Sequence, residues 1–256
     1  HSQRLRGTAR ASDRPVRALP RATIGHRLSF LTRKANMRLL DLFCGAGGAA
    51  MGYYYAGFTD IVGVDIIPQP HYPFQFIRAD ATTFPLEEFD FIHASPPCQG
   101  YSIMRNLPWL RDKSYPMLIE PTLERLEALG TPYALENVMG AKRVLSDAGW
   151  LCGGMFDLPL YRHRLFATNW LWHAPIHPKH KFTVRNGRKL GSRARDIVHN
   201  GAKNFGANYG HAAGVKDARQ AMGLLYMTRD ELTQAIPPAY TEYIGRQFLS
   251  QLASST

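Results

Sequence analysis

Short apolar runs alternate with helical periodicity from Met37 onward, and this alternation restricts the possible folds more than any other property of the chain. The apolar runs predict strands at 38–43, 60–65, 74–78, 89–94, 133–136 and 165–168. The helical periodicity predicts helices at 48–56, 114–129, 141–148, 217–222, 228–235 and 240–252. Strands that alternate with helices form a mostly parallel sheet with helices on both faces, and ligands bind at the carboxyl ends of the strands. We therefore predict an α/β fold of this kind.

The size and composition are those of a globular protein. The chain has 256 residues, of which 45% are hydrophobic and 20% charged, and it contains no apolar run of about 18 residues that could span a bilayer. Its three cysteines, Cys44, Cys98 and Cys152, are an odd number without CxxC spacing, which argues against a disulfide scaffold and a cysteine-based zinc site. We expect a soluble protein in a reducing, intracellular setting.

The positive charge lies in two segments. The net charge of +11 suggests a polyanionic partner such as nucleic acid. Residues 1–36 hold nine Lys and Arg against one acid, and residues 161–200 again hold nine against one. We interpret 1–36 as a disordered basic arm, either non-native or upstream-translated sequence or, as the alternative, an arm that grips DNA. The second segment belongs to the body of the protein.

A glycine-rich loop, DLFCGAGG over 41–48, joins the first predicted strand to the first predicted helix. Its glycines allow positive φ and let a ligand approach the backbone, although the loop matches neither GxGxxG nor the GK[ST] of a triphosphate site. Asp65 ends the second strand, where a carboxylate suits a ribose diol, and Asp80 follows the third. Each aspartate could instead cap a helix or form a turn. Together they favour an adenosine-type ligand.

A second loop, SPPCQGYS over 95–102, follows the strand at 89–94. Two prolines stiffen the backbone where the strand leaves the sheet and so fix the side chain of Cys98. A lone cysteine is usually a small buried apolar residue. Cys98, however, is predicted to face the ligand edge, and we interpret it as a nucleophile; Cys44 and Cys152 lack such a setting and are interpreted as structural.

These two loops occur together with Glu136-Asn137-Val138 and with the RxR of Arg162-His163-Arg164. In this order they resemble the cytosine-C5 DNA methyltransferases, in particular small phage or bacterial members. The resemblance covers about 37–168 and the last helices. It implies a Rossmann-like methyltransferase fold, S-adenosylmethionine as cofactor with S-adenosylhomocysteine as product, no metal, and double-stranded DNA as partner. It also implies a monomer in the cytoplasm of a bacterial or phage-infected cell, with a link to restriction-modification.

The resemblance assigns roles that fit the chemistry of cytosine. C5 is too weak a nucleophile to be methylated unaided, so Cys98 would first add at C6 of a flipped-out base. Glu136 would meet the charge that develops at N3, and Arg162 and Arg164 would lie near O2 and the thiolate. The implied cofactor-binding residues are Asp41, Phe43, Gly45, Gly47, Gly48, Asp65, Asp80 and Pro97. The implied DNA-binding residues are Gln99, Ser102, Lys181, Arg185, Arg188, Lys189 and Arg193.

The implied organisation is a catalytic core at 37–168, a short target-recognition insert at 169–216 and closing helices at 217–256. The chain departs from the family pattern at Leu160 and at Gln234-Ala235, neither of which touches the predicted chemistry. The histidines of the insert could suggest a metal site, but prolines interrupt their spacing, and we expect a solvated loop at His173, His177 and His180.

Three alternatives remain at this stage. A tRNA-type cytosine-C5 methyltransferase would use the same cysteine loop, and a catalytically silent nucleic-acid-binding homologue would keep the fold. An amino-group methyltransferase would need an aromatic residue where Cys98 stands, which makes this the weakest of the three.

Overall fold

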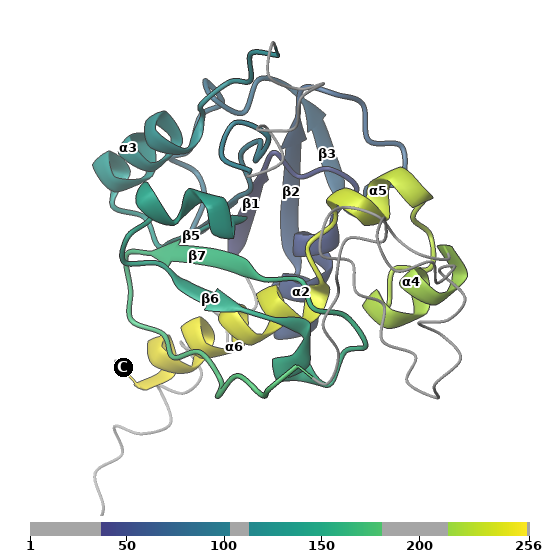
Figure 1. Ribbon diagram of the computed structural model, residues 1–256. Helices are drawn as coiled ribbons and strands as arrows, with labels where there is room; N and C mark the ends of the chain where they lie inside the picture. Colours follow the sequence, from purple (N-terminus) through teal and green to yellow (C-terminus); the bar gives the residue numbers. More distant parts are fainter. Residues whose placement is uncertain (1–36, 103–112, 181–214, 255–256) are drawn as a thin grey trace, which may run out of the picture.

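The computed structural model describes residues 37–102, 113–180 and 215–254, and their centre is a seven-stranded sheet (Figure 1). The strand order is β3-β2-β1-β4-β5-β7-β6. The strands are β1 (Arg38–Leu42), β2 (Asp60–Asp65), β3 (Gln75–Arg78), β4 (Phe91–Ala94), β5 (Tyr133–Val138), β6 (Gly149–Leu151) and β7 (Arg164–Thr168).

The first five strands are parallel, and β7 runs antiparallel to both β5 and β6. Strand β1 pairs with β2 on one side and with β4 on the other, so the order of the chain reverses beside it. A reversal of this kind opens a crevice at the carboxyl ends of the strands, where α/β proteins bind ligands. Both loops singled out in the sequence, 41–48 and 95–102, leave the sheet at this crevice.

Helices cover both faces of the sheet, as predicted. They are α2 (Gly48–Ala56), α3 (Ile119–Leu129), α4 (Val215–Met222), α5 (Arg229–Gln234) and α6 (Pro238–Ser254), with two 3₁₀ turns, η3 (Met139–Arg143) and η4 (Gly153–Phe156). Successive strand residues point to opposite faces. Leu39 therefore packs in the core beneath α2 and α6, and its neighbour Leu40 packs in the core beneath α3. None of the helices in the described ranges is both long and apolar enough to cross a bilayer.

Close packing of α2 against α6 joins the first helix of the described chain to its last. A Cβ on Gly52 would lie 2.1 Å from the carbonyl oxygen of Pro238, so only glycine lets the two backbones approach this closely. The Thr241 hydroxyl of α6 donates a hydrogen bond to the carbonyl of Ala49 in α2 at 2.8 Å. The last helix, which follows the predicted insert, thus packs against the helix that follows the first strand.

The structure confirms the predicted α/β architecture and corrects some of its elements. The helix predicted at 114–129 begins only at Ile119, because Pro116 disfavours helical backbone at the residue before it. The helix predicted at 141–148 is wrong: the 3₁₀ turn η3 is followed by turns, and the backbone N–H of Val144 bonds the carbonyl of Ala141 three residues earlier. The prediction also missed β6, a strand of only three residues.

Candidate active site

The glycine loop turns sharply between β1 and α2. Phe43, Gly45 and Gly47 have positive φ values of 56°, 49° and 84°. A Cβ on Gly47 would lie 2.7 Å from Cδ of Pro73, whereas one on Gly45 would meet nothing within 4 Å. The backbone at Gly45 therefore faces open space, into which a ligand could approach. Gly48, the first residue of α2, is buried against the segment before α6.

Asp41 lies under this loop and is fully buried. Its Oδ2 accepts a hydrogen bond from the Tyr72 hydroxyl at 3.2 Å, but its Oδ1 has no partner among the described residues. Burial raises the pKa of the Asp41 carboxyl well above its ordinary value. An unpaired buried carboxylate oxygen is costly, and it suits a bound donor such as an ammonium group.

The other two predicted cofactor aspartates differ from each other. Asp65 ends β2 and crosses to the glycine loop, where its Oδ2 accepts a hydrogen bond from the Gly45 backbone N–H at 3.0 Å. Asp80 is exposed, and its Oδ1 accepts hydrogen bonds from the backbone and hydroxyl of Thr82 at 2.8 and 2.7 Å. Asp65 thus bonds the glycine loop at the crevice. Asp80 instead forms a turn, which is the alternative that the sequence left open for it.

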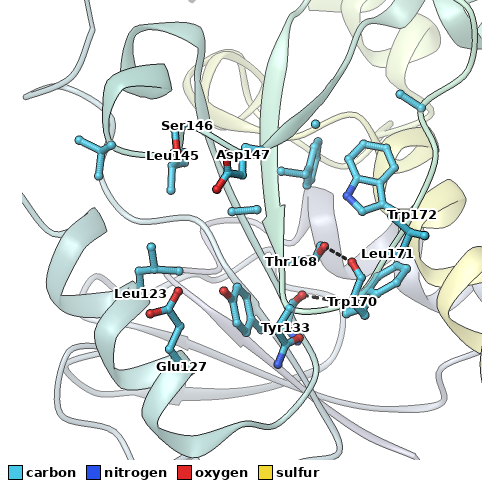
Figure 2. A pocket seen from close by; sticks show the side chains of 17 residues that line it. Leu123, Glu127, Tyr133, Leu145, Ser146, Asp147, Thr168, Trp170, Leu171 and Trp172 are labelled. Atoms are coloured by element: carbon cyan, nitrogen blue, oxygen red, sulfur yellow. Dashed lines mark hydrogen bonds between the residues drawn. The ribbon is translucent and has the colours of Figure 1, made fainter.

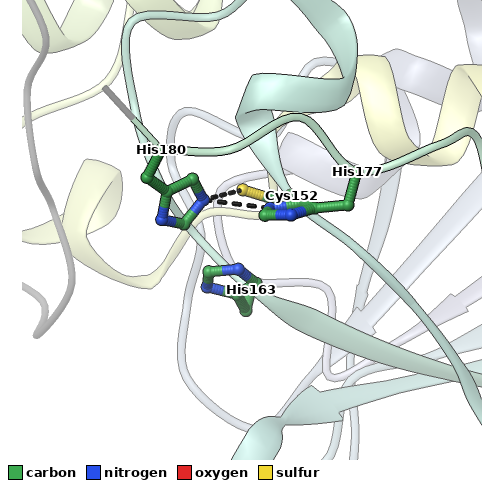
Figure 3. Close-up of side chains that lie close together, drawn as sticks. All are labelled: Cys152, His163, His177 and His180. Atoms are coloured by element: carbon green, nitrogen blue, oxygen red, sulfur yellow. Dashed lines mark hydrogen bonds between the residues drawn. The ribbon is translucent and has the colours of Figure 1, made fainter. Parts of the chain in front are cut away.

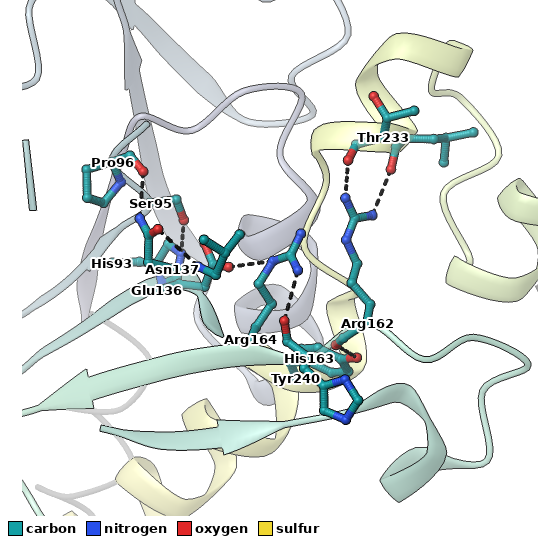
Figure 4. Close-up of polar contacts among 12 residues, drawn as sticks. His93, Ser95, Pro96, Glu136, Asn137, Arg162, His163, Arg164, Thr233 and Tyr240 are labelled. Carbon is teal, nitrogen blue, oxygen red and sulfur yellow. Dashed lines mark hydrogen bonds and ion pairs between the residues drawn. The ribbon is translucent and has the colours of Figure 1, made fainter. Parts of the chain in front are cut away.

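The cysteine loop is fastened at both ends. Asn137, near the end of β5, donates from Nδ2 to the carbonyl of Pro96 at 2.8 Å (Figure 4). Beyond Cys98 the backbone turns, with the N–H of Ser102 bonded to the Cys98 carbonyl at 2.9 Å. The hydroxyl of Tyr101 bonds both Glu120 and the N–H of Ile119 at the start of α3. The Cys98 thiol therefore has a fixed position, half-buried at the strand end.

Glu136 lies on β5 beside this loop, buried to 8% side-chain exposure. Its Oε1 lies 2.8 Å from Nε of Arg164, the first residue of β7. Burial nevertheless raises the pKa of Glu136, because it outweighs the opposite effects of Arg164, Arg162 and a hydrogen bond from Ser95. A carboxyl with a raised pKa is suited to donate a proton.

Behind Glu136 lies a chain of buried hydrogen bonds that the sequence analysis missed. Ser95, bonded to Glu136, lies 2.8 Å from Nε2 of His93 (Figure 4). The Nδ1 of this histidine lies 3.0 Å from the Tyr53 hydroxyl. Burial lowers the pKa of His93 to about 3, so its imidazole is neutral. A neutral ring protonated at Nε2 donates to Ser95 and accepts from Tyr53. The only sequence signal was a lone histidine in an apolar strand.

The two arginines of the RxR motif have different contacts. Arg164 pairs with Glu136, whereas the guanidinium of Arg162 donates to the carbonyls of Leu232 and Thr233 in α5 (Figure 4). Burial and Arg164 lower the pKa of Arg162 to about 9. Arg162 therefore holds α5 against the site, and Arg164 is the arginine in contact with the predicted acid.

The Cys98 thiol is protonated at rest. Burial and the nearby Glu136 raise its pKa, and the opposing effects of Arg164 and Arg162 do not offset them. The predicted nucleophile, acid and cation nevertheless converge at the carboxyl edge of β4 and β5. Such an arrangement can add a thiol to an electron-poor ring while a neighbouring acid neutralises charge on that ring.

The comparison with known families agrees with this geometry. Residues 37–142 match the family described as C-5 cytosine-specific DNA methylase. Over this segment the chain is similar to the cytosine-C5 DNA methyltransferases. The methylase domain so defined contains the glycine loop, Cys98 and Glu136.

Individual relatives match only in part. The Type II methyltransferase M.AquIA of Picosynechococcus is 30% identical over 122 residues, covering 40% of this chain and 49% of its own length. M.DdeI of Desulfomicrobium norvegicum is 30% identical over 121 residues, covering 41% of this chain and 28% of its own. An S-adenosylmethionine-dependent methyltransferase from Mesorhizobium loti has a TM-score of 0.30 at 18% identity, covering 50% of this chain and 59% of that one. The chain thus spans about half the length of M.AquIA and less of M.DdeI.

The remaining predicted site residues lie partly on the cysteine loop and partly outside the described residues. Gln99 is exposed, and Pro97 and Ser102 are partly buried, all on the cysteine loop. The remaining predicted DNA-binding residues lie outside the described residues: Lys181, Arg185, Arg188, Lys189 and Arg193. The expectation of a solvated histidine loop holds for exposed His173 and is wrong for the partly buried His177 and His180.

A pocket of about 620 Å³ lies at the other end of the strands, where β5 begins (Figure 2). Tyr133, at the start of β5, and Trp170, beyond the end of β7, line it, and Nε1 of Trp170 donates to the Tyr133 carbonyl at 3.1 Å. Glu136 and the cysteine loop lie instead at the carboxyl end of β5. The pocket is therefore separate from the candidate active site.

Proposed function

We propose that this protein transfers a methyl group from S-adenosylmethionine to C5 of cytosine in DNA, through a covalent bond between Cys98 and C6 of a flipped-out base. The observation that carries the proposal is the convergence of Cys98, Glu136 and Arg164 at the end of β4 and β5, beside a segment that is similar to the cytosine-C5 DNA methyltransferases. The description of the matching family, a cytosine-specific DNA methylase, supports DNA as the substrate.

Each of the three residues has a defined task. The Cys98 thiol gives its proton to a water molecule as its sulfur bonds to C6, and Glu136 donates its proton to N3, so that C5 becomes an enamine carbon. Arg164 stabilises the negative charge that remains on the carboxyl group of Glu136. After methylation a water molecule takes the C5 proton, the electrons of the C5–H bond form the C5=C6 double bond, the S–C6 bond breaks to release the Cys98 thiolate, and N3 returns its proton to Glu136. Arg162 holds α5 against the site through the carbonyls of Leu232 and Thr233.

The crevice has the donor set that S-adenosylmethionine requires, and this cofactor supplies the methyl group when bound. Asp41 offers a buried carboxylate oxygen without a partner among the described residues, which suits an ammonium group. The open space at Gly45 lets a ligand approach the backbone, and Asp65 at the second strand end suits a ribose diol. Phe43, partly buried at the turn, would contact the adenine.

The test is covalent trapping. The protein is incubated with S-adenosylmethionine and duplex DNA in which cytosine is replaced by 5-fluorocytosine. Because fluorine cannot leave as a proton, the enzyme should remain bonded to DNA through Cys98, as seen by gel shift under denaturing conditions and by peptide mass spectrometry.

Two controls and one competing substrate make the result decisive. Cys98→Ser should form no adduct, and Cys44→Ser, which changes the other cysteine of the methylase core, should form as much as wild type. An adduct that survives Cys98→Ser, or no adduct with any DNA, would overturn the mechanism. A 5-fluorocytosine-containing tRNA transcript that traps the enzyme in place of DNA would overturn the substrate assignment and leave the mechanism standing.

A further inference from the structure

Four potential metal ligands meet at the end of the β6–β7 pair where β6 stops and β7 begins (Figure 3). Cys152 follows β6 directly, and His163 directly precedes β7. His177 and His180 come from the segment after β7, which folds back over the same place. Three separate parts of the chain thus bring one thiol and three imidazoles together, and none of these residues has a task in the proposed methyl transfer.

The geometry is that of one coordination sphere. One ligand atom from each residue lies within 4.8 Å of all the others. The Nε2 of His180 is 3.3 Å from Sγ of Cys152 and 3.0 Å from Nε2 of His177. A tetrahedral zinc ion, with Zn–N and Zn–S bonds of about 2.0 and 2.3 Å, separates its ligand atoms by roughly 3.3–3.6 Å. Small shifts would bring all four atoms onto such a sphere.

The surroundings fix the orientation of the rings. Tyr161 stacks on His180 with centroids 3.9 Å apart and an interplanar angle of 11°. The indole of Trp150 contacts both His163 and His177, at centroid distances of 5.3 and 4.9 Å. Ligands held in place by packing bind a metal without a large loss of side-chain freedom, which is typical of a prepared site.

We propose that Cys152, His163, His177 and His180 bind a single structural Zn²⁺ ion. The ligand types decide the metal: thiolate and imidazole suit zinc, whereas Mg²⁺ and Ca²⁺ require oxygen ligands, and the cluster contains no carboxylate. The number of ligands decides the role, because four protein ligands close the sphere and leave no position for water or substrate.

The position of the ion gives it a structural consequence. His163 stands between Arg162 and Arg164, so a metal bond at this residue fixes the backbone from which both arginines extend. His177 and His180 immediately precede residue 181, where the predicted target-recognition insert continues. The ion would therefore hold the base of this insert against the β6–β7 pair, whose strand β7 carries Arg164. This inference does not depend on the proposed methyl transfer.

The first test is metal content and spectroscopy on the full chain. Protein purified in a reducing buffer without chelator should contain about one zinc per chain by mass spectrometry of the metal. After removal of the metal, titration with Co²⁺ should give the d–d absorption of a tetrahedral site and a thiolate-to-cobalt charge-transfer band. Wild-type protein that contains no zinc, and that shows neither feature with one equivalent of Co²⁺, would overturn the proposal.

Matched variants then assign the ligands. Cys152→Ser should lose the charge-transfer band, and His180→Ala should bind zinc at least tenfold more weakly. His173→Ala, an exposed histidine of the same segment, and Cys98→Ser, the separate nucleophile, should both keep wild-type zinc content and spectra. A charge-transfer band that persists in Cys152→Ser and disappears in Cys98→Ser would show that the metal binds elsewhere and would refute the site.

Discussion

His93 should make the stability of this protein depend on pH in a way that one substitution removes. Its side chain is fully buried in β4, and burial lowers its pKa from the ordinary 6.5 to about 3. In the unfolded chain the same imidazole takes up a proton below pH 6.5. The unfolded state therefore binds the additional proton, and the contribution of neutral His93 to stability is lost as the pH falls from 6.5 towards 3.

The size of the effect follows from this difference in pKa. Each pH unit within the window costs about 1.4 kcal/mol per proton. Between pH 7.5 and pH 5.0, His93 alone should lower the free energy of unfolding by about 2 kcal/mol. For a domain of this size that corresponds to a fall in melting temperature of roughly 4–8 °C. His93→Gln keeps an amide near the positions of both hydrogen bonds and cannot take up a proton, so it should lack this component.

The measurement is urea unfolding, followed by tryptophan fluorescence at pH 7.5, 6.0 and 5.0, for wild type and variant. Only the change with pH is compared, so that a constant loss of stability in His93→Gln does not affect the result. His173→Gln, at an exposed position, should follow the wild-type pH dependence. Equal pH dependence in wild type and His93→Gln would refute the reasoning that a neutral, buried imidazole supports Ser95 and Glu136.

Two further predictions concern the crevice. The pH midpoint for alkylation of Cys98 by iodoacetamide should lie above the ordinary thiol pKa of 9.0, because burial and Glu136 disfavour the thiolate. Glu136→Gln should lower this midpoint. A midpoint below 9.0, followed by peptide mass spectrometry, would contradict a thiol that is protonated at rest. Asp41→Asn should weaken S-adenosylmethionine binding by about 1.5–3 kcal/mol, measured by calorimetry. The same substitution should raise the melting temperature of the ligand-free protein, because it removes a buried carboxyl group with an unpaired oxygen among the described residues. Unchanged binding would show that Asp41 does not face the cofactor.

The parts of the fold that sequence predicted well are those whose determinants are local. Strand β2, fully apolar over Ile61 to Val64, reads as a buried parallel strand without further context. Helix α2 ends where Gly57 takes a left-handed conformation at φ 114°, and its predicted bounds are the observed ones. Strand β6 could not be found in this way, because three residues carry no periodicity and pair only through β7.

The contacts that define the site could not be predicted, because their partners lie far apart in the chain. The hydrogen bond between Tyr53 and His93 joins residues 40 positions apart, and the contact between Cys152 and His180 joins residues 28 apart. Cys98 and Glu136 were accessible only because their neighbours form recognisable motifs. Cys152, without such neighbours, was interpreted as structural, and its three imidazole partners become visible only in three dimensions.

The three residues of the RxR segment show why the site depends on more than its reactive groups. Arg162 bonds to carbonyls of α5, Arg164 pairs with Glu136, and His163 between them points to Cys152. One short segment at the start of β7 therefore contacts the closing helices, the Glu136 carboxyl and the proposed metal site. A displacement of this backbone by any one contact must move the other two. The position of Arg164, the partner of Glu136, therefore depends also on the contacts of its two neighbours.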